Sequence, residues 1–227
     1  MKNLKQKIIL SILASFLLFV FAIKAQAQKA EAGIRYMPTI SAFDLKNSDG
    51  GSVHGQATFG HGGGILIGYS LTDLFEIQGE VIYNTLSQKY KEQDIERNIN
   101  LRYINIPILA SFNTGKKKLV NFNAVVGPQI GLNVGSSVKT TSGNIINVPD
   151  AVVSVSKGDL GFAYGVGVDF GLNSSKTFRL GIGFRGVYGL FDISDHSKTI
   201  VTNSYYVIDH THIKTYSAYI GASYLFL

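Results

Sequence analysis

The chain contains no cysteine and no tryptophan among its 227 residues. Without cysteine it cannot form a disulfide scaffold, a thiolate metal site or a lipidated N-terminal cysteine. Beyond its N-terminal segment it has no apolar run of the length that a membrane-spanning helix needs. Its mean hydropathy of +0.16 is far below that of a helical membrane protein. Glycine (25 residues), phenylalanine (14) and tyrosine (12) are plentiful instead, which favours an all-β protein.

The N-terminal segment has the order of a secretory signal peptide. A basic start (residues 1–7) precedes an apolar run (8–23), and Ala25-Gln26-Ala27 supplies a small-residue cleavage site. A transmembrane anchor is the alternative, but the cleavage site directly behind the apolar run favours the signal peptide. We therefore expect cleavage near Ala27, which removes residues 1–27 and leaves residues 28–227 as the mature domain.

Most of the formal charge of +6 comes from this signal segment. Four of the 21 basic residues lie in it and no acidic residue does, so the mature chain keeps 17 basic against 15 acidic residues. The mature net charge is therefore near +2, and it gives no support to nucleic-acid binding, although the whole sequence has a pI of about 9.3.

A period-two pattern runs through residues 160–190 and identifies a pair of strands. Large apolar residues occupy nearly every second position in 160–172 and again in 178–190, with mostly small or charged residues between them. A strand sends alternate side chains to opposite faces, so one face is large and apolar while the other is small or charged. Lipid suits the first face and a narrow polar lumen suits the second, as in a hairpin of a transmembrane β-barrel.

The same alternation predicts eight strands in the mature chain. We place them at residues 32–42, 63–71, 75–84, 99–112, 119–134, 160–172, 178–190 and 213–227. The connections alternate between long ones (43–60, 88–98, 135–158 and 194–211) and short turns, of which one carries Lys116, Lys117 and Lys118 as a solvated tip. Outer-membrane barrels have long extracellular loops and short periplasmic turns. We therefore expect an all-β, eight-stranded, antiparallel, up-and-down transmembrane β-barrel.

A soluble lipocalin-like barrel is the alternative fold, but it would carry its large apolar side chains inside. Three prolines, Pro38, Pro107 and Pro128, fall within the predicted strands. A closed barrel has no edge strand, and proline has no N–H to donate to a ladder. Each proline should therefore remove a ladder hydrogen bond or mark a bulge.

Three short motifs occur in an order that resembles a known family. They are Tyr103-Ile104-Asn105-Ile106-Pro107, Gly127-Pro128-Gln129-Ile130-Gly131 and Arg185-Gly186-Val187-Tyr188-Gly189-Leu190. With the aromatic last strand, they resemble the outer-membrane β-barrel domain of PorT-like proteins from Bacteroidota. Asn105 departs from the acidic residue expected there, and Leu227 follows the aromatic Phe226 that usually ends such barrels. The resemblance implies a Gram-negative outer-membrane location and an eight-stranded barrel. PorT itself is linked to protein secretion and gliding.

The polar face of the predicted strands carries six charged residues. They are Arg35, Glu76, Glu80, Asp169, Arg179 and Arg185. Charges in a low-dielectric lumen must pair, so we expect a network of Arg and acidic side chains across the barrel. A structural filling of the lumen is the first interpretation, and a gated path for protons or small ions is the second. Eight strands disfavour an open porin, because aqueous channels usually need about sixteen strands.

The chain offers little material for catalysis or metal binding. His210 and His212 have strand spacing that places both imidazoles on one side, but no third ligand lies at a fixed distance, so a solvated loop pair is the simpler interpretation. No nucleophile and base are spaced as a catalytic pair. We therefore expect no catalytic residue, no cofactor-binding residue and no metal ligand.

Most of the tyrosines fit girdles at the membrane interfaces, but Tyr205 and Tyr206 lie within the last long loop. They are candidates for a surface that contacts a partner protein. We expect a non-enzymatic structural or interaction module with a plugged polar lumen, surrounded by outer-membrane lipid. A subunit of a secretion or envelope-assembly complex is one alternative, and a lipid-modifying enzyme is another.

Overall fold

The structure is a computed structural model that describes residues 30–53, 55–92, 95–142, 149–197 and 204–226. The predicted signal peptide at residues 1–27 lies outside these described residues. No helix in the described part of the chain has the length and apolar character needed to cross a membrane.

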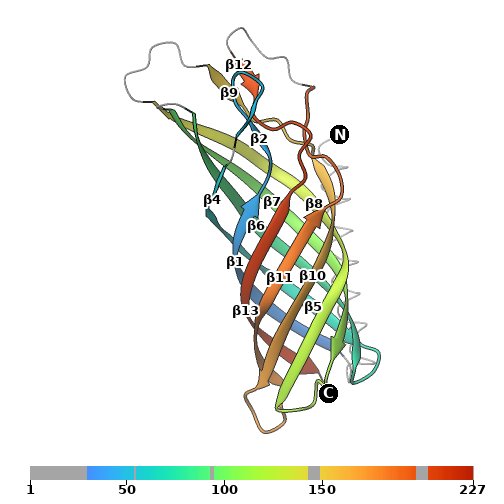
Figure 1. The fold of residues 1–227 in the computed structure, drawn as a ribbon. Coiled ribbons are helices and arrows are strands. Elements are labelled where there is room, and N and C mark those ends of the chain that lie inside the picture. Colours follow the sequence, from blue (N-terminus) through green and yellow to red (C-terminus); the bar gives the residue numbers. More distant parts are fainter. Residues whose placement is uncertain (1–29, 54, 93–94, 143–148, 198–203, 227) are drawn as a thin grey trace, which may run out of the picture.

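Eight long strands form a closed antiparallel ring (Figure 1). They are β1 (Ala30–Ala42), β5 (Phe59–Ser70), β6 (Phe75–Glu92), β7 (Ile95–Asn113), β8 (Val120–Ser142), β10 (Gly158–Gly171), β11 (Phe178–Gly189) and β13 (Lys214–Phe226). Each of these strands pairs with its sequence neighbours in the ring, and the first pairs with the last, so that Ala30 lies opposite Phe226. The predicted eight-stranded up-and-down barrel is confirmed.

The wall of the barrel is apolar outside and polar inside along its lower part. On β6, the outward Ile77, Val81 and Tyr83 are 45–48% exposed, while the inward Glu76 and Glu80 are at most 3% exposed. Large exposed apolar side chains form a belt around all eight strands. An outward apolar band with a polar interior is the arrangement that a barrel needs in a lipid bilayer.

Each of the three strand prolines lies at a break in one ladder. The pairing of β1 with β13 is interrupted at Pro38, that of β6 with β7 at Pro107, and that of β7 with β8 at Pro128. In every case the strands pair again in the same register beyond the break, because proline lacks only its own N–H donor. The prolines therefore remove ladder pairs rather than shift the register, which was the first of the two expectations.

Three strands extend beyond the apolar belt at the end of the long loops. The prediction of a loop at residues 88–98 is wrong, because β6 continues to Glu92 and β7 begins at Ile95, with Lys89 paired to Asn98. The predicted loop at 135–158 is also shorter, since β8 runs to Ser142 and pairs with β7 up to Ile95. We call this part of the sheet, residues 85–92, 95–102 and 135–142, the extension.

The two faces of the sheet exchange polarity in the extension. Below it the inward residues include most of the buried charges, with a few apolar side chains such as Ile82 and Leu109, whereas within it the inward Leu86, Tyr90, Ile99 and Leu101 are buried and apolar. The outward residues of β7 become Glu96, Asn98, Asn100 and Arg102. The register shifts between Arg102 and Tyr103, where β8 carries one extra residue, so the exchange coincides with a β-bulge. An apolar inside with a polar outside is typical of a sheet in water.

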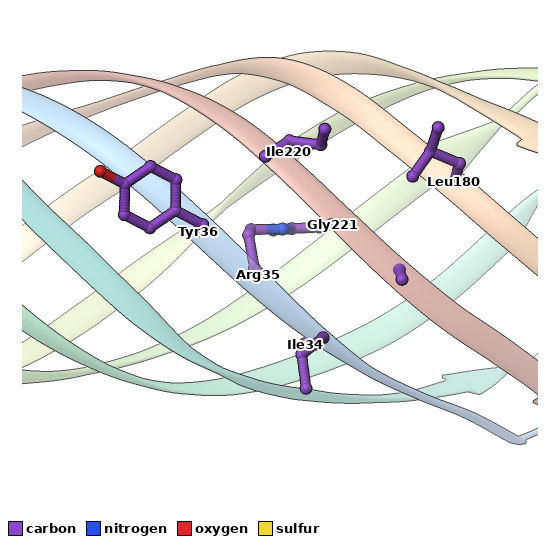
Figure 2. A pocket seen from close by; sticks show the side chains of 7 residues that line it. Ile34, Arg35, Tyr36, Leu180, Ile220 and Gly221 are labelled. Atoms are coloured by element: carbon purple, nitrogen blue, oxygen red, sulfur yellow. The ribbon is translucent and has the colours of Figure 1, made fainter.

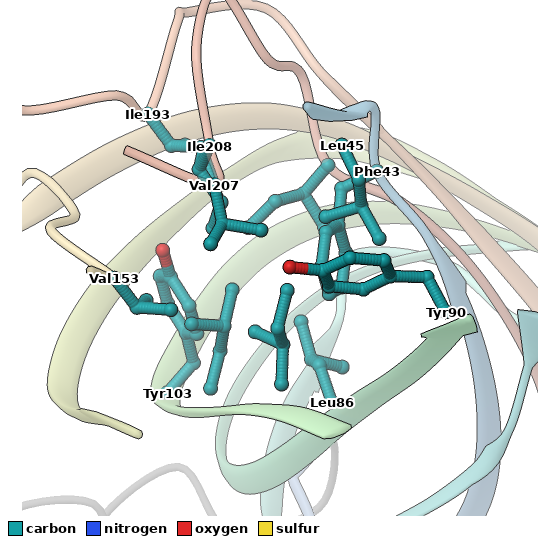
Figure 3. Packing of buried hydrophobic residues seen from close by; sticks show 12 residues of the cluster. Phe43, Leu45, Leu86, Tyr90, Tyr103, Val153, Ile193, Val207 and Ile208 are labelled. Carbon is teal, nitrogen blue, oxygen red and sulfur yellow. The ribbon is translucent and has the colours of Figure 1, made fainter. Parts of the chain in front are cut away.

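The long loops fold over the inner face of the extension. They contain five short strands: β2 (Leu45–Lys46), β3 (Ser52–Val53), β4 (Gln56–Ala57), β9 (Asp150–Val152) and β12 (Ser204–Tyr206). Their apolar residues join those of the extension in one buried cluster, which we call the upper cluster (Figure 3). Its members are Phe43, Leu45, Leu86, Tyr90, Ile99, Leu101, Tyr103, Val153, Ile193, Val207, Ile208 and Ile213.

Candidate functional site

The centre of the lumen is organised around Glu80. Its carboxylate accepts from Arg35 Nη1 at 2.5 Å and from Arg185 Nη2 at 3.2 Å, and the side-chain amide of Gln78 also donates to it. Glu80 and Arg185 are buried, so these charges lie out of bulk water and compensate one another. The arrangement can hold strands β1, β6 and β11 together through a single carboxylate.

Tyr219 covers one side of this central group. The guanidinium of Arg35 lies 4.1 Å from the centroid of its ring, which is a cation–π contact. The Tyr219 ring lies along the inner wall over Gly183 of β11 and Gly167 of β10, and a Cβ at Gly183 would lie 2.6 Å from the ring carbon that bears the hydroxyl. These two glycines therefore make room for the ring.

A second charged group lies at the short-turn end of the barrel. Lys116 pairs with Glu76 at 2.6 Å and also with Glu31, and all three side chains are buried. The prediction of a solvated tip at residues 116–118 is therefore wrong for Lys116. The turn bends inward at Gly115, whose φ is +140° and whose N–H donates to Asn121 Oδ1 at 3.0 Å, and this directs Lys116 into the lumen.

Asp169 and Arg179 lie near this lower group but bind other partners. Asp169 accepts from the side-chain amides of Asn121 and Asn123 at 3.1 and 2.8 Å. Arg179 donates to backbone carbonyl oxygens, among them those of Lys116 at 2.8 Å and Asp169 at 3.1 Å. The structure thus places the six predicted lumen residues inside the barrel, as separate groups rather than as one network of ion pairs.

Three buried charged residues of the interior were not predicted from the sequence. Glu31 precedes the predicted first strand, Lys116 was assigned to a solvated turn, and Arg97 was assigned to a loop. Arg97 is fully buried at the edge of the upper cluster, where it donates to Glu92 Oε2 at 2.6 Å and to the carbonyl oxygen of Pro149 at 2.6 Å. The alternation of Ile95, Arg97 and Ile99 was the available signal, because it has the period of a strand with its apolar face inside.

The structure places Tyr205 and Tyr206 on β12, which pairs in parallel with β9. The Tyr205 hydroxyl lies 2.8 Å from the Tyr90 hydroxyl and accepts from Arg97 Nη1 at 2.6 Å. The Tyr206 ring packs edge-on against His196, with the ring centroids 4.7 Å apart. Both side chains are half-buried. They make contacts within the loops and also contribute to the surface.

The loop between β11 and β13 is held by acidic side chains. Asp192 accepts from the N–H of Ser194 and the N–H of Thr211, each at 2.9 Å, and lies 3.0 Å from His210 Nδ1. Burial acts to raise the pKa of Asp192, but these hydrogen bonds outweigh it and lower its pKa to about 2. The ammonium of Lys46 binds Asp209 and lowers the pKa of that carboxyl.

His210 and His212 do not converge on a common point. His210 contacts Asp192, whereas His212 lines a surface pocket of about 220 Å³ together with Asp44 and Lys214. Within the described ranges, no three His, Cys, Asp or Glu side chains are grouped so that they could hold a metal ion.

A shallow apolar groove of about 270 Å³ lies on the outer wall where β1, β13 and β11 meet (Figure 2). Ile34, Tyr36, Leu180 and Ile220 surround it, and Gly221 and Ala222 leave space between them. Because these apolar residues belong to the outward face, the groove is open to lipid rather than to the lumen.

The comparisons with known proteins agree with this architecture. The sequence matches the family described as outer membrane protein beta-barrel domain over residues 13–226. The structure is similar to OprG from Pseudomonas aeruginosa, with a TM-score of 0.56 at 12% identity over 87% of this chain and 96% of OprG. No curated protein matches the sequence.

Two further solved structures are more distant in shape. The attachment invasion locus protein Ail of Yersinia pestis, solved with a heparin analogue, has a TM-score of 0.39 at 14% identity, over 86% of this chain and 99% of Ail. The outer membrane enzyme PagL has a TM-score of 0.31 at 12% identity, over 81% of this chain and 97% of PagL. The family match spans nearly the whole sequence, and the chain belongs to the outer membrane protein beta-barrel domain family.

Proposed function

We propose that this barrel is a non-enzymatic structural or interaction module of the outer membrane, with a plugged lumen and with its extracellular loops as the working surface. The observation that carries the proposal is the upper cluster, in which three loops and two strands bury apolar side chains across the long-loop end. The paired charges of Glu80, Arg35 and Arg185 further occupy the middle of the lumen. Side chains fill the lumen at the upper cluster and at the level of Glu80, as expected for a barrel of eight strands.

Reconstitution into a planar lipid bilayer tests the plugged lumen. The protein should show no steady ion conductance at moderate voltage, because buried side chains occupy the lumen both at the upper cluster and at Glu80. The double substitution L86A/I99A in the upper cluster is the matched probe, since it removes packing without changing any charge. A steady conductance of the unaltered protein would contradict the proposal and favour the gated ion path.

As an alternative role for this module, we propose a PorT-like subunit of a secretion or envelope-assembly complex of Bacteroidota. The motif order around Pro107, Pro128 and Arg185 supports this assignment. Gentle solubilisation of native outer membranes followed by affinity purification should recover a stoichiometric set of envelope or secretion proteins. Recovery of the barrel alone would contradict the complex and leave a self-sufficient module.

Two parts of the proposal have direct chemical tests. We propose that residues 1–27 are a signal peptide, and N-terminal sequencing of the mature protein should begin at Gln28. We propose that the barrel has no enzymatic activity, so the lipids of membranes with and without it should have the same mass spectra. A lipid whose mass changes only when the protein is present would favour the lipid-modifying enzyme.

A further inference from the structure

The outer face of the extension carries a group of basic side chains, which we call the basic wall. Its members are Lys89 and Lys91 on β6, Arg102 on β7 and Lys139 on β8. Asn98 lies between Lys89 and Lys139 in the paired strands, so these two lysines flank one residue on the same face. Arg102 lies opposite Gly135, where an added Cβ would come 2.5 Å from Arg102 Nη2, so the glycine lets the guanidinium lie across β8.

This face has an excess of positive charge. Glu96 is the one acidic residue that the described part of the outer face contains, and it pairs with Lys89 at 3.0 Å. Within the described ranges, Lys91, Arg102 and Lys139 take part in no ion pair, and all three side chains are exposed. Glu92 does not neutralise them because its carboxylate is bound to the buried Arg97. Among the residues that the structure describes, these three exposed cations therefore have no carboxylate partner.

The basic wall is continuous with the lipid-facing belt of the same strands. Directly below Arg102, the outward residues of β7 include Ile104 and Ile108, and those of β8 below Gly135 include Leu132 and Val134. A lipid whose acyl chains lie along this part of the belt would place its headgroup against Arg102 and the lysines above it. Anionic headgroups attract such juxtamembrane cations.

We propose that the basic wall binds the phosphorylated headgroups of glycolipid in the outer leaflet. The apolar residues below it contact the acyl chains, and Arg102 offers a planar guanidinium that can bind a phosphate with two hydrogen bonds. Lys91 and Lys139 supply further charge at a higher level. The amides of Asn98 and Asn100 lie between the cations on the same face and provide neutral donors for phosphate or sugar oxygens.

Native mass spectrometry of the detergent-solubilised full chain can test this proposal with bisphosphorylated lipid A as the probe. The triple variant K91Q/R102Q/K139Q should bind this lipid at least about tenfold more weakly than the unaltered protein, since each cation near an anionic surface contributes to attraction. The matched control is K117Q/K118Q/K157Q, which removes three exposed lysines elsewhere. Heat-modifiable migration on a gel verifies that each variant is folded.

Two further arms distinguish the source of the phosphate. Lipid A from which both phosphates have been removed should bind the triple variant and the unaltered protein equally. Inorganic phosphate, at the concentrations at which lipid A saturates, should leave lipid binding unchanged. Equal losses in the triple variant and its control, unchanged binding of dephosphorylated lipid A to the unaltered protein, or displacement by free phosphate would each overturn the proposal.

Discussion

Arg185 on β11 and Glu80 on β6 are separated by half of the ring, yet Arg185 Nη2 lies 3.2 Å from Glu80 Oε1. The two strands are four positions apart in either direction around the barrel. Arg35 reaches the same carboxylate from β1, which lies between them. A single acidic side chain therefore links three strands, of which two are diametrically opposed.

Replacing Glu80 with Gln should destabilise the barrel strongly. Both Arg35 and Arg185 would keep their charge without a carboxylate, and removing one partner of a buried ion pair typically costs about 3 to 5 kcal/mol. Urea unfolding in lipid vesicles, followed by heat-modifiable migration, measures the change in free energy of unfolding. The matched control is Glu96→Gln, whose exposed pair with Lys89 should contribute less than about 1 kcal/mol. Equal effects of the two substitutions would show that the central group is not a structural link.

Lys116 and Lys117 are neighbours in one turn and should respond differently to substitution. Lys116→Met removes the cation between Glu31 and Glu76, and we expect a loss of about 3 kcal/mol in the free energy of unfolding. Lys117 is largely exposed and lies 3.9 Å from Asp73, so Lys117→Met should change it by less than about 0.5 kcal/mol. Denaturant titration of both variants compares the two sites. If Lys116→Met left the free energy of unfolding unchanged, Lys116 would behave as a solvated turn residue and not as a buried ion-pair partner.

Because Gly167 contacts Tyr219, we expect a substitution at Gly167 to destabilise the barrel and a second substitution at Tyr219 to restore part of the lost stability. Alanine at position 167 would place its Cβ against the Tyr219 hydroxyl, and overpacking of this kind typically costs about 1 to 3 kcal/mol. Tyr219→Phe removes the clashing oxygen, so the double variant G167A/Y219F should be more stable than G167A. Gly79→Ala is the control, because nothing lies within 4 Å of an added Cβ there. Thermal gel-shift midpoints of the variants report the order, and the absence of rescue would refute the contact.

The loop that Asp192 holds should loosen in acid. The pKa of Asp192 is lowered in the folded loop from 3.8 to about 2, so its contribution to loop stability is present above about pH 4 and is lost as the pH falls through about 2. Pepsin cleavage of the intact protein should therefore increase at this loop between about pH 4 and pH 2. Asp192→Ala removes the acceptor and should be cleaved throughout that range. If the Asp192→Ala variant were as resistant as the unaltered protein at both pH 4 and pH 2, other contacts would hold the loop.

The part of the barrel that faces lipid could be predicted from the sequence. Residues such as Ile77, Val81 and Tyr83 alternate with polar ones, and this period-two pattern indicates strands with one apolar and one polar face. The extension could not be predicted in the same way, because its polarity is reversed. Tyr90 and Ile95 face inward there, so the rule that places large residues outside assigned them to the loop predicted at residues 88–98.

The inward direction of the charged residues on strands followed from the same alternation, but their partners did not. Arg185 and Glu80 are 105 residues apart in the sequence, and their meeting depends on the diameter of the ring. Lys116 was missed because the direction of a turn residue depends on the backbone, here on the positive φ of Gly115. Arg97 was missed together with the extension that carries it.

The exchange of polarity at Arg102 and Gly135 also fixes the depth at which the barrel sits in the bilayer. If the protein moved deeper into the bilayer, Arg102 would enter the hydrocarbon, where the cost of an outward Arg rises from about 0 to 1 kcal/mol near the interface to about 2 to 4 kcal/mol at the midplane. If it rose, the apolar belt would lose lipid contact at about 25 cal/mol for each Å² exposed to water. Both displacements are unfavourable, so the β-bulge beside Arg102 lies at the level of the membrane surface. The extension and the loops that it supports are thereby held at a constant height above the membrane.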